Sequence, residues 1–422
     1  MVMRISTSFF FSNGLHGMQR VQKQLVDTQE RISTGNKILF PSEDPVATTK
    51  VFVFEEQLKM TEQYQENITY ALNSNQLAES VLGQLEASIQ RIRELAVQAN
   101  NSHLNEHDLR SIANEIDGLS LEMANLMNSK DGVGDYLFSG FQGLQKPFIP
   151  RPGGGYEYRG DQGEPRMQVS SETKMSFSFS GKPVFVDVDS TLNSLKTSAA
   201  EQNSEESTAL ISVGKVVDQE LFDEVYPENY ILTFNDPPTT YNVIHRDDRS
   251  PVVGDSPSGD LINIPYADGA SIQFNGLEFY ISGIPQADDT FFIESTHQQD
   301  ILTGMYRFSE LLKDTADNMD FLSTVEGQTA FQISYEAALS DMDTALLSVS
   351  QERSRMGVNL NQLERLQDMH DGLIVELNEF LSSVRDVDIA EAATTLNQES
   401  FILQASQSSF AKITQLTIFN YI

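Results

Sequence analysis

The chain of 422 residues contains no cysteine, and its 28 basic residues stand against 61 acidic ones. The lack of cysteine excludes disulfide bonds, thiolate metal sites and cysteine nucleophiles together. The formal net charge of -33 repels phosphate backbones and anionic lipids, so nucleic acid is not expected as a partner. No apolar run approaches the roughly 18 residues of a membrane span, so no membrane insertion is expected either.

Acidic residues are also missing from both ends of the chain. The first acidic residue is Asp27, and the last 23 residues carry a single charged side chain, Lys412. The apolar start continues into a polar helical pattern without a small-residue cleavage site, which does not fit a cleaved signal peptide. A secreted protein with this start must leave the cell by another export route.

Apolar residues recur at helical spacing in the first third of the chain. Between Leu15 and Ile32 they alternate steps of three and four, as in a coiled-coil seam, and Gly35 ends this pattern. The row from Ala78 to Ala99 repeats the alternation for about three heptads, which predicts a long helix whose seam is intramolecular core. Another helix is expected at about Glu106 to Ser129.

The composition changes between about residues 131 and 300, where most of the Gly and Pro occur among short runs of β-forming residues. Strands are expected at Tyr230 to Phe234, Tyr241 to Ile244 and Phe291 to Ile293. Asn275 and Gly276 join two alternating runs and predict a hairpin with a type I′ turn. Residues 198 to 208 indicate a linker or a solvated helix. From about Asp300 the helical period returns and lasts almost to the end.

The order of these segments predicts an α+β fold in which a β-rich insertion separates two helical arms that must meet in space. We expect an elongated rod of long helices, a coiled-coil-like bundle formed by both chain ends, with the β-rich part between them. The expected divisions are an assembly and export segment at 1 to 44, a helical rod half at 45 to 140, a β-rich outer domain at 141 to 300, a second rod half at 301 to 384 and an assembly segment at 385 to 422.

The sharpest catalytic pattern is His103-Leu104-Asn105-Glu106-His107, which fits the H-x-x-E-H motif of zinc peptidases. That motif needs both histidines on one continuous helix. Here Asn105 is a good helix cap with Asp108 three residues later, so the pattern straddles a turn. A solvated turn is therefore favoured over zinc, and no catalytic residue, metal or cofactor is expected.

The two outermost segments, about residues 3 to 40 and 385 to 422, are amphipathic and have little internal surface left to cover. They are therefore candidates for contacts between subunits.

Motifs in these segments resemble the bacterial flagellin family, and more closely its hook-filament junction branch. Those near the start are Met3-Arg4-Ile5-Ser6, Arg31-Ile32-Ser33-Thr34-Gly35 and Pro41-Ser42-Glu43-Asp44-Pro45. Those near the end are Arg355-Met356-Gly357, Asp386-Val387-Asp388-Ile389-Ala390 and Gln404-Ala405. Tyr136 to Gly140, Tyr158 to Asp161 and Ile281 to Pro285 favour the junction branch over filament flagellin.

The resemblance implies a secreted, extracellular subunit of the bacterial flagellum, exported unfolded through the flagellar type III channel. It implies chain ends that are largely unstructured in the free subunit and pair as helices on assembly. The implied partners are its own copies in a ring, hook-associated protein 1 on the hook side, flagellin, and a type III export chaperone. Filament flagellin itself is the alternative, and a zinc peptidase is the remote one.

Fourteen residues of the two terminal segments are predicted to shape subunit contacts. Nine belong to the motifs named above: Arg31, Ile32, Ser33, Gly35, Asp44, Pro45, Asp386, Asp388 and Ala390. Five supply apolar contact area: Leu25, Val384, Leu396, Ile413 and Leu416.

Overall fold

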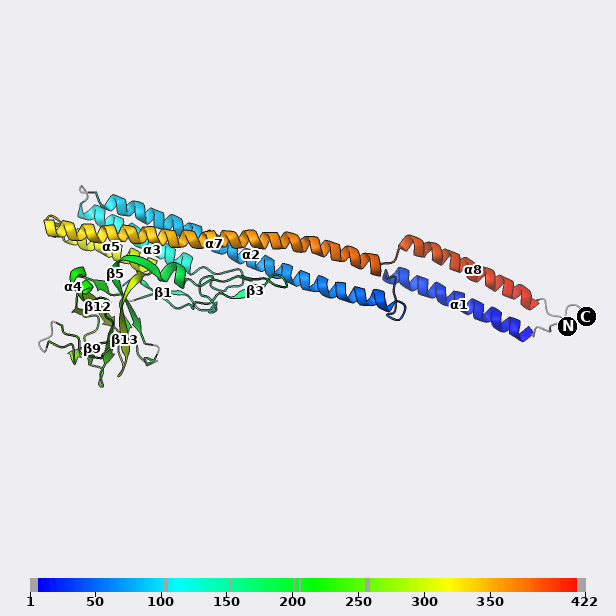
Figure 1. The fold of residues 1–422 in the computed structure, drawn as a ribbon, viewed down its shortest axis with the longest axis horizontal. Coiled ribbons are helices and arrows are strands. Elements are labelled where there is room, and N and C mark those ends of the chain that lie inside the picture. Colours follow the sequence, from blue (N-terminus) through cyan, green and yellow to red (C-terminus); the bar gives the residue numbers. More distant parts are fainter. Residues whose placement is uncertain are drawn as a thin grey trace, which may run out of the picture. The chain divides into compact units, whose positions relative to one another are not determined.

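A computed structural model describes residues 7–101, 105–151, 154–200, 202–204, 206–254 and 259–415 of the chain (Figure 1). The chain forms two compact units. The terminal unit combines residues 1–66 with residues 366–422, and the central unit comprises residues 67–365. The predicted α+β class is confirmed, with helices from both chain ends packed together and a β-rich region in the middle of the sequence.

The terminal unit contains two helices of its own and the ends of two long ones. These are α1 (Thr7–Thr34), α8 (Ile389–Gln415), the first part of α2 (Pro45–Ala99) and the last part of α7 (Val325–Arg385). In Figure 1, α1 (dark blue) and α8 (red) lie side by side. They are antiparallel, because Phe11 near the start of α1 meets Phe410 near the end of α8, with ring centroids 5.7 Å apart.

The helices of the central unit enclose the predicted seam. Beside α2 and α7 they are α3 (Glu106–Met127), α5 (Ile301–Asp317) and α6 (Met319–Leu322). Every seam residue is at most 5 % exposed, which confirms the core reading: Ala78, Leu82, Leu85, Ile89, Ile92, Ala96 and Ala99. A capping box starts α3, with Asn105 and Asp108 bonding each other's backbone N–H groups.

Two small hairpins and a π-helical turn follow α3. They are β1 (Phe148–Pro150) with β2 (Tyr156–Tyr158), β3 (Arg166–Gln168) with β4 (Lys174–Ser176), and η1 (Lys182–Val186). Aromatic side chains from this layer, including Phe138, Phe148 and Phe185, join the core of the helices. The layer is therefore part of the helical body and not of the β sheets that follow.

Two antiparallel sheets enclose a second apolar core. The larger has the order β10-β9-β8-β13-β5, and the smaller has the order β11-β12-β6 with β7 also paired to β12. The strands are β5 (Val188–Ala199), β6 (Leu210–Ile211), β7 (Lys215–Val216), β8 (Tyr230–Phe234), β9 (Thr240–His245), β10 (Ile264–Pro265), β11 (Ser271–Phe274), β12 (Leu277–Ser282) and β13 (Thr290–Gln299), with helix α4 (Gln219–Val225) after β7.

Burial alternates along β8, β9 and β12 as one-sided strands require. The three strands predicted in this region are confirmed as β8, β9 and part of β13. Aromatic residues fill the core between the sheets, among them Tyr230, Phe234, Phe274, Phe279 and Phe291. These side chains are buried and hold the two sheets together.

Between the two alternatives for residues 198 to 208, the structure favours the linker over the solvated helix. Residues 198 and 199 end β5, and the described part of the remainder is a loop without helix. Asp289 accepts hydrogen bonds from the Ser204 N–H, at 3.2 Å, and from the Ser207 hydroxyl. Asn203 exchanges two more with Thr290. Several of its described residues are exposed, as the polar composition predicted, and the Asn203 and Ser207 side chains also bind the neighbouring strand end.

The predicted hairpin is confirmed, with Phe274 paired to Leu277 across the turn. Asn275 and Gly276 have φ angles of 49° and 75°, as a type I′ turn requires. Gly276 also has no room for a side chain, because a Cβ there would lie 2.2 Å from the Asp218 carbonyl oxygen.

Gly276→Ala should therefore lower the free energy of unfolding of the β-rich part by roughly 3 kcal/mol, from backbone strain and a clash together. Gly269→Ala is the matched control, since Gly269 has φ +69° and a Cβ added there would meet no atom within 4 Å. We expect it to cost about 1 kcal/mol. Urea unfolding followed by near-ultraviolet circular dichroism measures both, and equal losses would contradict the close approach.

Candidate assembly surface

The contact between α1 and α8 is a two-helix coiled coil. On each helix the less exposed positions recur in steps of three and four. On α1 they are Phe11, Gly14, Met18, Val21, Leu25, Thr28 and Ile32, and on α8 they are Ala392, Leu396, Glu399, Leu403, Ser406 and Phe410. The sequence pattern from Leu15 to Ile32 is thus largely confirmed as a seam, with its partner in the same chain.

This seam is weakly apolar for a coiled coil. Gly14, Thr28, Glu399 and Ser406 occupy seam positions, and most of the other seam residues are only half-buried. A pair of helices has one contact face each and gains little burial per residue. The pair therefore depends on further packing for most of its stability.

Apolar side chains outside the seam face away from it. Their exposed fractions are 61 % for Phe9, 49 % for Leu15 and 50 % for Val26 on α1, and 63 % for Ile389, 71 % for Phe401 and 40 % for Ile402 on α8. Scattered exposed apolar residues are normal on a protein surface, but two aromatic rings and four aliphatic chains on one helix pair are typical of an interaction surface.

A second exposed row lies on the part of α2 that belongs to the terminal unit. Val46, Val53 and Met60 follow one another at intervals of seven residues and are 67 %, 54 % and 46 % exposed. Seven residues are close to two helical turns, so the three side chains share one face. We call them the heptad stripe. On α7, Met369, Val375 and Phe380 are similarly exposed.

The turns that follow α1 and precede α8 meet in a short antiparallel bridge, which we call the clasp (Gly35–Lys37 with Arg385–Val387). The Val387 N–H donates to the Gly35 carbonyl at 2.8 Å, and the Lys37 N–H donates to the Arg385 carbonyl at 2.6 Å. Asn36 pairs with Asp386 between them. Gly35 has φ +74°, a left-handed conformation that ends α1 and turns the chain into the clasp.

Charged groups support the clasp from both sides. Arg31 contacts Glu43 at 3.2 Å, and Arg385 contacts Glu55 at 3.4 Å and Asp386 at 3.0 Å. The hydrogen bond from Arg385 lowers the pKa of Asp386 below its ordinary value. These pairs are exposed, so they fix geometry more than they stabilise the fold.

Each helix that leaves the clasp begins with an aspartate cap. Asp44 accepts from the Val46 and Ala47 N–H groups of α2 at 3.1 and 2.9 Å. Asp388 accepts from the Ala390 and Glu391 N–H groups of α8 at 2.8 and 3.2 Å. Asp44 is thus the cap of α2, and Pro45 occupies the first turn of that helix.

The fourteen predicted contact residues fall into three groups in the structure. At or beside the clasp lie Arg31, Ser33, Gly35, Asp44, Pro45, Val384, Asp386, Asp388 and Ala390. In the α1–α8 seam lie Leu25, Ile32 and Leu396. Ile413 belongs to α8, but its side chain, all of Leu416 and the opening motif at residues 3 to 6 lie outside the described residues.

Sequence reasoning did not single out Phe9, Phe401 or the heptad stripe, which the structure leaves exposed. The spacing of Val46, Val53 and Met60 was readable as a stripe. Only the structure shows that the chain leaves this stripe open.

The histidine pattern of the remote zinc reading lies only in part within the described residues. His103 lies outside the described residues, and His107 belongs to α3 behind the Asn105 cap. Within the described part of the chain, no three His, Cys, Asp or Glu side chains gather as a metal site.

Among the helices that the structure describes, none has the length and apolarity of a membrane span.

Both helical arms match sequence models of one family. Residues 5–143 match the bacterial flagellin N-terminal helical region, and residues 339–422 match the bacterial flagellin C-terminal helical region. The chain belongs to the bacterial flagellin family.

Within this family the chain is similar to flagellar hook-associated protein 3 of Salmonella typhimurium, with 33 % identity over 183 residues. That match covers 43 % of this chain and 57 % of the relative, little more than half of its length. The crystal structure of flagellar hook-associated protein 3 from Legionella pneumophila aligns with a TM-score of 0.52 and 26 % identity, covering 79 % of this chain and 98 % of that one.

A phase 1 flagellin of Salmonella naestved is 30 % identical over only 101 residues, which are 24 % of this chain and 20 % of the flagellin.

Proposed function

We propose that this chain is a structural subunit of the bacterial flagellum that forms the junction ring between hook and filament, and that flagellin polymerises on it. The observation that carries the proposal is the helix pair α1–α8, which is built from both chain ends and exposes apolar side chains away from its seam. Such a pair gains most of its burial from neighbouring subunits. The similarity to hook-associated protein 3 supports the junction over the filament.

The proposed partners follow from that position. They are further copies of the chain in a ring, hook-associated protein 1 on the hook side, flagellin on the filament side, and a type III export chaperone before secretion. The protein acts outside the cell and carries out no catalysis. The five-part division of the chain, with assembly segments at 1 to 44 and 385 to 422, is part of the same proposal.

The proposed action is mechanical. The clasp ties the start of α8 to the end of α1, so the two helices move as one element when a neighbouring subunit contacts either of them. The exposed apolar side chains of α1 and α8 form one apolar surface, and the heptad stripe forms another. A neighbouring subunit can shift along such a surface by one helical turn, so that each side chain contacts a different partner. We propose that such steps adapt a curved hook to a stiff filament, and that the fourteen predicted residues shape these contacts.

Filament flagellin is the second candidate, supported by the match to the Salmonella naestved flagellin. Labelled antibody on isolated flagella distinguishes a junction subunit from filament flagellin. A junction subunit is labelled at one band where hook meets filament, and its loss leaves hooks that shed flagellin into the medium. Label along the whole filament, or long homopolymers grown from the purified chain, would reject the junction in favour of flagellin.

Exposed apolar residues of the helix pair should matter for assembly and not for folding. Phe401→Ser removes a ring that is 71 % exposed, and Ile284→Ser in the central unit is the matched control at 69 %. We expect both purified chains to keep the wild-type circular dichroism. Phe401→Ser should reduce the protein incorporated into flagella about tenfold or more, which corresponds to about 1.4 kcal/mol of contact energy.

Immunoblots of isolated flagella measure this incorporation. Wild-type levels for Phe401→Ser, or an equal loss for Ile284→Ser, would show that the exposed side of α8 is not the contact.

A further inference from the structure

The loop of residues 140–147, which we call the Leu144 loop, presents an apolar tip to solvent. Leu144 is 90 % exposed and Phe141 is 69 % exposed. Lys146 beside them is exposed and forms no ion pair with another described residue. An isolated exposed leucine needs no explanation, but a leucine, a phenylalanine and an unpaired lysine on one short loop are typical of a contact element.

The Leu144 loop is fixed from within. The Asp161 carboxylate accepts from the Phe141 N–H at 3.0 Å, and the Gly143 carbonyl accepts from the Tyr136 N–H at 2.7 Å. The Phe141 ring lies against Gly163, where a Cβ would be 2.0 Å from the ring. A loop held in this way loses little conformational entropy when it binds.

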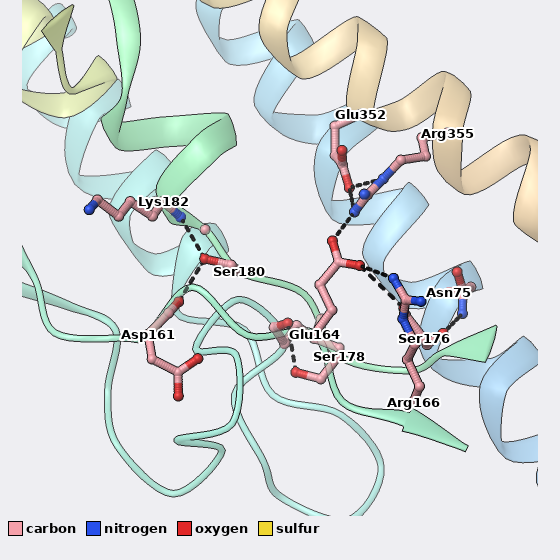
Figure 2. Close-up of polar contacts among 12 residues, drawn as sticks. Asn75, Asp161, Glu164, Arg166, Ser176, Ser178, Ser180, Lys182, Glu352 and Arg355 are labelled. Atoms are coloured by element: carbon pink, nitrogen blue, oxygen red, sulfur yellow. Dashed lines mark hydrogen bonds and ion pairs between the residues drawn. The ribbon is translucent and has the colours of Figure 1, made fainter. Parts of the chain in front are cut away.

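The layer that carries the loop is bonded to α2 and α7. The Asn75 amide donates to the Ser176 carbonyl at 3.0 Å, and Arg355 of α7 donates to Glu164 at 2.7 Å. Figure 2 shows the Glu164 carboxylate between Arg355 and Arg166, with Glu352 bound to the same Arg355. The loop therefore has a fixed place relative to α7 within the central unit.

An acidic groove lies between α2 and α7 of the same unit. Its volume is about 550 Å³, and we call it the Gly357 groove. It is lined by Glu79, Glu86, Ser350, Arg353, Ser354, Gly357, Leu360, Asn361 and Glu364. A Cβ at Gly357 would meet nothing within 4 Å, so the groove is open there.

The rim of the Gly357 groove is acidic. Three carboxylates face one cation, because Arg353 pairs with Glu79 at 2.7 Å and with Glu86 at 3.0 Å. Glu364 forms no ion pair within the described part of the chain. Lys146 of the loop and Glu364 of the groove therefore have complementary charge.

The loop and the groove are on opposite sides of α7. Arg355 faces the layer that carries the loop, and Glu364 is nine residues later. At about 100° per residue the two side chains point roughly 180° apart around the helix axis. Within one chain the loop cannot enter its own groove, whereas two different patches that bind each other between copies build a ring or a helical array.

We propose that the Leu144 loop of one copy docks in the Gly357 groove of the next copy, with Leu144 over Gly357 and Lys146 beside Glu364. This inference rests on the proposed function, since it names the contact that joins neighbouring copies in the ring. The contact is head-to-tail. Each copy uses its loop on one side and its groove on the other.

The absence of cysteine makes the test direct. A chain with Leu144→Cys and Gly357→Cys is expressed in place of the wild type, and isolated flagella are oxidised mildly. A non-reducing gel should then show a ladder of dimers, trimers and larger species. Either substitution alone is the control and should give no ladder, because the bridge needs one cysteine from each patch.

Labelled antibody on the same flagella separates failure of the contact from failure of the function. Double-cysteine protein at the hook-filament boundary without a ladder would overturn the docking and leave the function standing. Wild-type protein absent from that boundary would overturn both.

A charge swap tests the contact without oxidation, in case the cysteine variant is not incorporated. Lys146→Glu and Glu364→Lys should each reduce incorporation severalfold, and the double variant should restore it. Two single variants with wild-type incorporation, or a double variant as poor as either single one, would overturn the pairing.

Discussion

The antiparallel pairing of α1 with α8 uses one face of each helix and leaves the remaining faces in water. This constraint follows from the order of the chain, because the first and last segments are amphipathic and, among the helices that the structure describes, α1 packs chiefly against α8. Their seam includes Gly14, Glu399 and Ser406. Pairing within the chain therefore buries little apolar surface. Phe9 and Phe401 remain exposed on the other faces. On the proposed function, contacts with neighbouring subunits remove these side chains from water.

The clasp joins the end of α1 to the start of α8 and so fixes how the two helices pair. Gly35 ends α1 and turns the chain into the clasp, and its carbonyl accepts a hydrogen bond from the Val387 N–H just before α8. The motifs that suggested a family are therefore joined to each other by backbone hydrogen bonds, although about 350 residues separate them in the sequence. Asp44 and Asp388 then start α2 and α8 at fixed points. Residues predicted for contacts between subunits thus also have a role within the chain, which fixes the register in which the contact faces are presented.

Much of this architecture could be predicted from the sequence. The buried seam from Ala78 to Ala99, the Asn275-Gly276 hairpin and the Asn105 cap follow from local periodicity or turn chemistry, which one segment carries alone. The predictions were weaker where the outcome depends on a distant partner. Leu25 and Leu396 have the same apolar character as Phe401, and only the placement of α1 against α8 decides which of them face the seam.

The loop that follows β5 shows the same limit. Its polar composition indicated a solvated linker or helix, whereas Asn203, Ser204 and Ser207 bind the turn and strand end at Asp289 and Thr290. Hydrogen bonds to a segment about 85 residues away leave no signal in local composition. The Leu144 loop and the Gly357 groove were likewise invisible before the fold brought each to the surface, because exposure is a property of the folded chain.

Amide hydrogen exchange on the free subunit and on assembled flagella measures the central claim most directly. The account predicts that amides of α1 and α8 exchange rapidly in the free chain, because the one-sided pair is weak, and become protected on assembly. Amides in the buried α2 segment from Ala78 to Ala99 should be protected in both states. Equal and strong protection of α1 and α8 in the free and assembled protein would contradict the account, since the chain ends would then be sheltered without neighbours.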